Sequence, residues 1–66
     1  MDIRQLEYFR KIAETGSISE AARQLNLSQP PLSYQLRMLE TELGVSLFVR
    51  SRQGVSLTEA GRVLYQ

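Results

Sequence analysis

The chain contains no cysteine, no histidine and no tryptophan among its 66 residues. The absence of cysteine excludes disulfide bonds and thiolate metal sites. The absence of histidine removes the commonest metal ligand and the commonest general base at neutral pH. The sequence also has no glycine-rich phosphate loop and no cluster of metal ligands. We therefore expect no catalytic activity, and no cofactor or metal ion in this domain.

Long apolar segments are missing as well. No apolar run approaches the roughly 20 residues of a membrane-spanning helix, and the start, MDIRQLEY, lacks the apolar core of a secretory signal. We therefore expect a soluble, cytoplasmic protein without a membrane partner. A chain of 66 residues is one small domain. Its net charge of +1 neither favours nor excludes a nucleic-acid partner, because the location of charge matters more than its sum.

A first helix is predicted over residues 3–16. Its apolar residues repeat at helical spacing, and we expect the resulting stripe to face the core. The members of this stripe are Ile3, Leu6, Tyr8, Phe9, Ile12 and Ala13. Gly16 suits the left-handed position that commonly ends a helix, so a turn is expected there.

The sequence SISE predicts the start of a second, short helix. Ser17 and Glu20 have the spacing of a capping box, in which each side chain binds an otherwise unpaired backbone N–H group. The apolar residues that follow at positions i, i+3, i+4 and i+7 predict its buried face. They are Ile18, Ala21, Ala22 and Leu25. Asn26 tolerates a left-handed conformation and is expected to end this helix.

Two adjacent prolines open a third helix, which is predicted to continue to about Leu43. With Ser28 as its N-cap, Pro30 and Pro31 fall in the first turn, where backbone N–H groups have no acceptor within the helix. Four leucines lie within roughly 40° of one another on a helical wheel and predict the buried stripe. They are Leu32, Leu36, Leu39 and Leu43. The opposite side carries a mixed set of residues, namely Pro30, Ser33, Tyr34, Arg37 and Thr41.

The stretch LFVRSRQGVSLT predicts a short β-hairpin. Residues 47–49 and 55–57 favour strands, and the glycine of SRQG suits a positive φ in the turn. Arg50 and Arg52 lie near the tip, and no acidic residue occurs between Val45 and Thr58. Thr58 is the predicted N-cap of a last helix, which is still running at the end of the chain.

The order of these elements predicts a mainly α-helical fold, a winged helix-turn-helix with a three-helix core. We expect this domain to span residues 1–57 and residues 58–66 to be the truncated start of a longer helix. Two helices joined by the tight turn LNLS are typical of helix-turn-helix proteins, whose second helix enters the major groove of DNA with its N-terminal residues at base edges. Gln29 can bind an adenine edge, and the prolines offer apolar edges to a thymine methyl group.

The candidate DNA-binding residues come from the starts of the second and third helices and from the hairpin. They are Ser17, Ser19, Ser28, Gln29, Pro30, Pro31, Ser33, Tyr34, Arg37, Arg50, Arg52 and Gln53. We expect the hairpin arginines to contact phosphates or the minor groove. Several of these residues also have an interpretation without DNA, as solvated surface, as a cap or as packing on a neighbour. The alternative function is a winged-helix module that binds protein, whose outward face should be more apolar and continuous.

The runs AARQLNLSQPPLS, LETELGVSLF and LTEAG, in this order and spacing, resemble the N-terminal DNA-binding domain of the LysR-type transcriptional regulators. The resemblance covers nearly the whole chain. It implies a winged helix-turn-helix, a linker helix from about Thr58 and a C-terminal domain, absent here, that senses a small-molecule effector. It also implies a homodimer or tetramer on dyad-symmetric promoter sites of the bacterial nucleoid.

The same resemblance implies roles for individual residues. Gln29 and the two prolines would approach bases, while Ser33, Arg37 and the wing arginines would lie near DNA. The chain departs from the family pattern at two positions. Tyr34 occupies a position that is often basic in relatives, and Gln53 stands where the wing often has a second arginine, which is Arg52 here.

Overall fold

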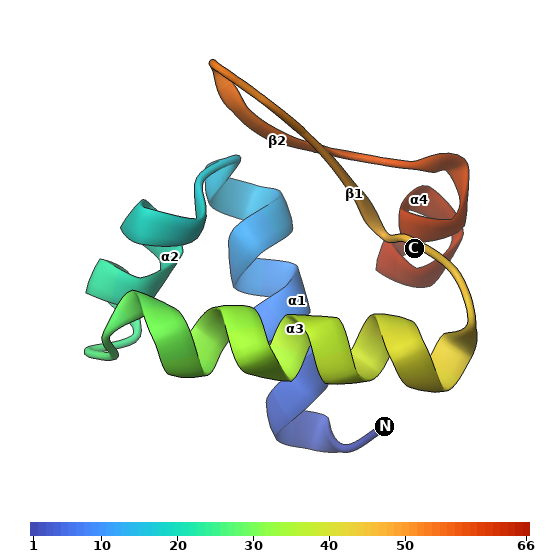
Figure 1. Ribbon diagram of the computed structural model, residues 1–66, viewed down its shortest axis with the longest axis horizontal. Helices are drawn as coiled ribbons and strands as arrows, with labels where there is room; N and C mark the ends of the chain where they lie inside the picture. The colour runs from blue at the N-terminus through green and yellow to red at the C-terminus, as the bar shows by residue number, and fades with distance from the viewer.

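The computed structural model describes all 66 residues, which form four helices and one antiparallel two-stranded sheet (Figure 1). In chain order the elements are α1 (Ile3–Thr15), α2 (Ile18–Gln24), α3 (Gln29–Leu43), β1 (Phe48–Ser51), β2 (Gly54–Leu57) and α4 (Glu59–Tyr65). The predicted mainly helical, winged helix-turn-helix fold is confirmed. None of the helices combines the length and the apolar character that a membrane-spanning segment needs.

One hydrophobic core joins the first three helices to the base of the hairpin. Its ten buried residues are Phe9, Ile12, Ile18, Ala21, Ala22, Leu32, Leu36, Leu39, Leu47 and Phe48. The rings of Phe9 and Phe48 meet with their centroids 5.4 Å apart, so α1 contacts the hairpin directly. Because Ala21 and Ala22 are small, α1 and α3 can both pack closely against α2.

The start of α1 differs from its prediction. Ile3 is 78% exposed and Leu6 36% exposed, although both were expected in the buried stripe. Together with Phe9, Leu64 and Tyr65 they line an open pocket, where solvent takes the place of a packed neighbour. The capping box of this helix was not predicted, although the spacing of Asp2 and Gln5 indicates it; Asp2 Oδ1 accepts from the Gln5 N–H at 2.7 Å.

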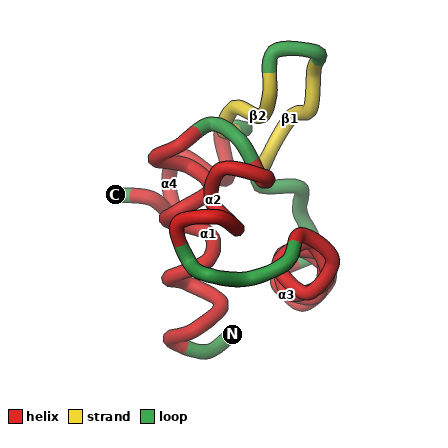
Figure 2. The backbone as a smooth tube through the Cα atoms, turned by 90° about the vertical axis from the view of Figure 1, so that its left-hand side faces the viewer, coloured by secondary structure: helices red, strands yellow, loops and turns green.

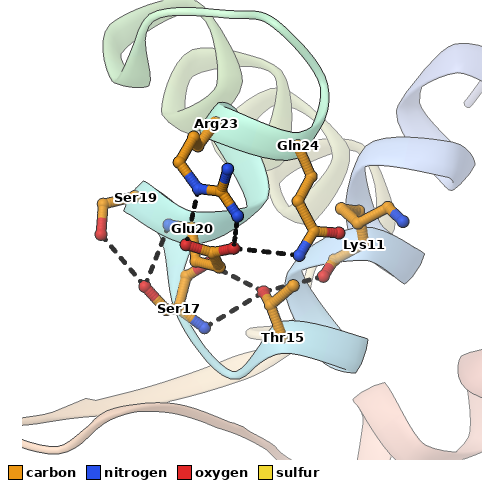
Figure 3. A network of polar contacts seen from close by, with 7 residues as sticks. All are labelled: Lys11, Thr15, Ser17, Ser19, Glu20, Arg23 and Gln24. Carbon is orange, nitrogen blue, oxygen red and sulfur yellow. Dashed lines mark hydrogen bonds and ion pairs between the residues drawn. The ribbon is translucent and has the colours of Figure 1, made fainter.

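The predicted capping box of α2 is only half correct. Ser17 Oγ accepts from the Glu20 N–H at 3.1 Å, as expected. The Glu20 carboxylate does not bind Ser17 in return, because it accepts from the side chains of Arg23 and Gln24 (Figure 3). The Ser17 N–H donates instead to Thr15 Oγ1 at 3.3 Å. Thr15 thus replaces Glu20 as the second partner of this helix start.

Helix α3 begins and ends at the predicted positions, but two of its details were predicted wrongly. Ser28 occupies the N-cap position and its side chain makes no capping hydrogen bond. The N–H groups that an N-cap oxygen would accept belong to the second and third helical residues, which here are Pro30 and Pro31 and have none. Leu43, expected to be buried, is 38% exposed, because the last turn of α3 runs past its crossing with α1 (Figure 1).

The hairpin is shifted slightly from its prediction, with Phe48 paired to Leu57 and Ser51 paired to Gly54. Leu47 was expected in the first strand and is instead a buried residue just before it. Both ends of the hairpin are tied to the helices. The Val55 N–H donates to Gly16 O at 3.0 Å. At the base, the Leu47 N–H donates to Glu40 Oε2 at 2.7 Å.

Helix α4 follows the hairpin closely, and its predicted cap is confirmed. Thr58 Oγ1 accepts from the Gly61 N–H at 3.0 Å and donates to Ser46 O at 2.7 Å. Gly61 is buried so tightly that an added Cβ atom would lie 2.2 Å from Leu47 O. The start of α4 is therefore part of the folded body.

Candidate nucleic-acid interface

Helix α3 and the hairpin lie on the same side of the molecule, whereas α4 and the C-terminus lie on the opposite side (Figure 2). This arrangement presents the start of α3, its outward face and the hairpin tip together. Ten of the twelve candidate residues are exposed to solvent, and Ser17 and Ser33 are half-buried. The structure thus brings residues from three separate segments to one surface, which we call the α3–wing surface.

The first turn of α3 is open to solvent at every candidate position. Ser28, Gln29, Pro30 and Pro31 are all exposed. A helix N-terminus normally offers its first backbone N–H groups to an anion, and the prolines remove two of these donors. The Ser28 hydroxyl has no capping partner. At this helix end a ligand would therefore be bound mainly by side chains and less by backbone N–H groups.

Positive charge is left unneutralised on the α3–wing surface. Arg37, Arg50 and Arg52 are exposed, and none of the four ion pairs of the chain includes them. In contrast, Arg10, Lys11 and Arg23 each pair with a glutamate on their own helix. Arg4 on α1 and Arg62 on α4 are also outside the ion pairs. A net charge of only +1 thus conceals a local excess of positive charge at α3 and the wing.

The start of α2 adds hydroxyl groups that are already engaged with each other. Ser17 Oγ lies 3.1 Å from Ser19 Oγ, and it also caps the helix (Figure 3). Beside them, hydrogen bonds from Arg23, which has the larger effect, and from Gln24 lower the pKa of the Glu20 carboxyl to about 2. The same contact raises the pKa of Arg23. The two charges neutralise each other, so this segment presents mainly hydroxyl groups.

The hairpin tip is a two-residue connection formed by Arg52 and Gln53 between the paired Ser51 and Gly54. The Gln53 N–H donates to Ser51 Oγ at 3.3 Å, which fixes the turn. Gly54 has φ +127°, and an added Cβ atom would lie 2.2 Å from Gly16 O. The hairpin therefore packs directly on the α1–α2 turn, which sets the position of its arginines relative to Ser17.

Sequence reasoning missed two residues of this region. Met38 is 43% exposed on the outward side of α3, and helical spacing from Tyr34 would have found it. Glu40 is half-buried and accepts the Leu47 N–H at the base of the hairpin. No local pattern indicates this contact, because it joins a helix end to a backbone group seven residues away.

Comparison with known proteins gives consistent results. Residues 3–62 match the family model described as bacterial regulatory helix-turn-helix protein, lysR family. The probable cat1 operon transcriptional activator of Acinetobacter lwoffii is 48% identical over 66 residues, which are 100% of this chain and 22% of that protein. The transcriptional regulator ClcR of Pseudomonas putida is 54% identical over 61 residues, which are 92% of this chain and 21% of that protein. The chain thus spans about a fifth of the length of these relatives.

Solved structures of similar proteins have the same fold. The CbnR DNA-binding domain in complex with DNA matches with a TM-score of 0.94 and 46% identity, over 98% of this chain and 75% of that one. The BenM DNA-binding domain in complex with catB site 1 DNA matches with a TM-score of 0.96 and 42% identity, over 100% of this chain and 74% of that one. Sequence, family model and fold agree, and the chain belongs to the LysR family of bacterial regulatory helix-turn-helix proteins.

Proposed function

We propose that this chain binds double-stranded DNA sequence-specifically, as the DNA-binding domain of a bacterial transcription regulator. The observation that carries the proposal is the α3–wing surface, where α3, with its exposed start, lies on the same side of the molecule as the hairpin, and these two elements carry three unneutralised arginines. Helix-turn-helix proteins place their second helix in the major groove. The DNA complexes of CbnR and BenM, whose domains share this fold, support the same role here.

The candidate residues take different roles in this proposal. Gln29 can form paired hydrogen bonds with an adenine edge, and Pro30 can contact a thymine methyl group. The free hydroxyl of Ser28 is suited to a phosphate, as are Ser17, Ser19 and Ser33. Arg37 lies on the outward face of α3. The wing supplies Arg50, Arg52 and Gln53 to the backbone or to the adjacent minor groove.

The proposal is tested by selecting duplexes from a random-sequence pool at two salt concentrations. Enrichment of one sequence, with affinity that falls steeply as salt increases, is the expected result, because phosphate contacts release counterions. Weak binding to every duplex would contradict sequence-specific recognition. It would favour the alternative of a module that binds protein, to which the exposed Tyr34 and Met38 would contribute.

We further propose that residues 1–57 form the DNA-binding domain and that residues from Thr58 onward begin a linker helix through which the whole protein forms a homodimer or tetramer. The side chain of Val63, which is 68% exposed, supports this division, because it leaves one face of α4 without a packed neighbour. Such an oligomer would bind dyad-symmetric promoter sites. Analytical ultracentrifugation of the chain and of a Val63→Asp variant tests the contribution of this face, which predicts weaker self-association of the variant.

A further inference from the structure

The outward side of α3 is divided lengthwise into two strips of different chemistry. Successive residues of a helix are rotated by about 100°. One sector therefore holds Ser33, Arg37 and Thr41, which carry hydroxyl groups and a guanidinium, with Pro30 between them in the first turn; we call it the polar strip. The neighbouring sector holds Pro31, Tyr34 and Met38, within roughly 60° of one another; we call it the apolar strip.

Contacts at the two margins of α3 show how the strips are oriented. Glu40 borders the polar strip, and it accepts the Leu47 N–H at the base of the hairpin at 2.7 Å. Gln35 borders the apolar strip, and it accepts from Gln5 Nε2 of α1 at 3.1 Å. The polar strip therefore lies on the side of the wing, and the apolar strip lies on the side of the start of α1.

The apolar strip has no role in the core. Tyr34 is 56% exposed and Met38 43% exposed, and both point away from the buried leucines of α3. Exposed apolar side chains that gather on one helix face usually mark a binding surface. The strip begins in the same helical turn as Gln29 and adjoins Arg37, so its ligand is the ligand of that surface. On the face that enters the major groove, the apolar group available to it is the C5-methyl group of a pyrimidine.

We propose that the apolar strip selects thymine by contact with its C5-methyl group, and that Tyr34 is the specificity-determining residue of this contact. The inference rests on the proposed DNA binding and adds the base class that one half of α3 recognises. Ser33, Arg37 and the wing arginines bind the phosphate backbone on the other side of the helix. Tyr34 then contributes to sequence selection through its ring and not through paired hydrogen bonds.

The experiment uses the selected half-site and replaces each thymine in turn with deoxyuridine, which removes only the methyl group. At one position we expect affinity to fall about 4-fold, the ratio that corresponds to about 0.8 kcal/mol for one buried methyl group. Tyr34→Ala should abolish this difference at that position alone, whereas Tyr34→Phe should retain it. Thr41→Ala, on the polar strip, is the matched control and should also retain it. Both positions, Tyr34 and Thr41, are exposed, and thermal melts confirm that each of the three variants folds.

The outcomes separate this inference from the proposed function. A selected half-site without thymine would overturn the inference, and so would a uracil effect that is unchanged in Tyr34→Ala. In both cases sequence-specific DNA binding would still stand. A pool from which no sequence is enriched would contradict the proposed function itself, and the role of the apolar strip with it.

Discussion

At the scale of single residues, Gln29 has the most specific predicted role on the α3–wing surface, which is the recognition of one base. Its side chain is exposed in the first turn of α3, so its removal should leave the fold unchanged. We expect Gln29→Ala to lose about 1–3 kcal/mol of discrimination at one base pair of each half-site. Affinities for the selected site and for its single-base variants measure this loss. Gln66→Ala, on the opposite side of the molecule, is the control, and equal weakening on all sequences would contradict base recognition.

Glu20 gives a prediction about pH. Its pKa of about 2 in the folded chain lies below its ordinary value of 4.5, so ionised Glu20 stabilises the folded state. This contribution is complete above about pH 4.5 and is lost as the pH falls toward about 2. An NMR titration of the Glu20 carboxyl carbon measures the midpoint directly. In Arg23→Ala, which lacks the first cause of the shift, the midpoint should rise; an unchanged midpoint would exclude Arg23 as the cause.

At the scale of elements, the wing is expected to add phosphate contacts without sequence preference. Arg50→Ala should weaken binding to all duplexes and reduce the slope of log affinity against log salt by about 1. The reason is that one fewer phosphate is neutralised. Arg10→Ala on α1 serves as the control, because Arg10 faces Glu14 away from the α3–wing surface. A slope that is the same in Arg50→Ala and the original chain would mean that Arg50 remains in solvent.

The attachment of the wing to the helices is a second property at this scale. A Cβ atom on Gly54 would collide with Gly16 O at 2.2 Å, and the φ of +127° already disfavours other residues. We expect Gly54→Ala to displace the hairpin from the α1–α2 turn and to cost about 1–3 kcal/mol of unfolding free energy. Urea denaturation measures the cost. Because the wing arginines move with the hairpin, the salt slope should fall together with stability. Ser56→Ala, an exposed strand position, should change neither.

At the scale of the whole molecule, the sequence was sufficient to predict the order of elements and most of the core. Helical spacing identified Phe9, Ile12 and three leucines of α3 because each helix has one side facing the same core. It failed for Ile3, Leu6 and Leu43, which lie at helix ends that extend beyond the core. Periodicity describes a helix and carries no information about where its neighbours stop.

The candidate site was predictable in outline for a related reason. Residues such as Gln29 and Arg37 fall opposite the buried stripe, so their exposure follows from the same spacing that predicts the core. Contacts between distant segments do not follow from this spacing. The hydrogen bond from Leu47 to Glu40 and the packing of Gly54 on Gly16 depend on how the hairpin returns to the helices. The substitutions above test which residues bind DNA.

The two prolines at the start of α3 also act on the chain before it folds. Each restricts the backbone of the unfolded state, which at a compatible position stabilises the folded state by about 0.4–1 kcal/mol. An N-cap hydrogen bond, which Ser28 lacks, contributes about 1 kcal/mol. The stabilisation that a proline provides and the stabilisation that is lost with the N-cap hydrogen bond are therefore of similar size. The reduced entropy of the unfolded state thus stabilises this helix start in place of the N-cap hydrogen bond, and the Ser28 hydroxyl stays free.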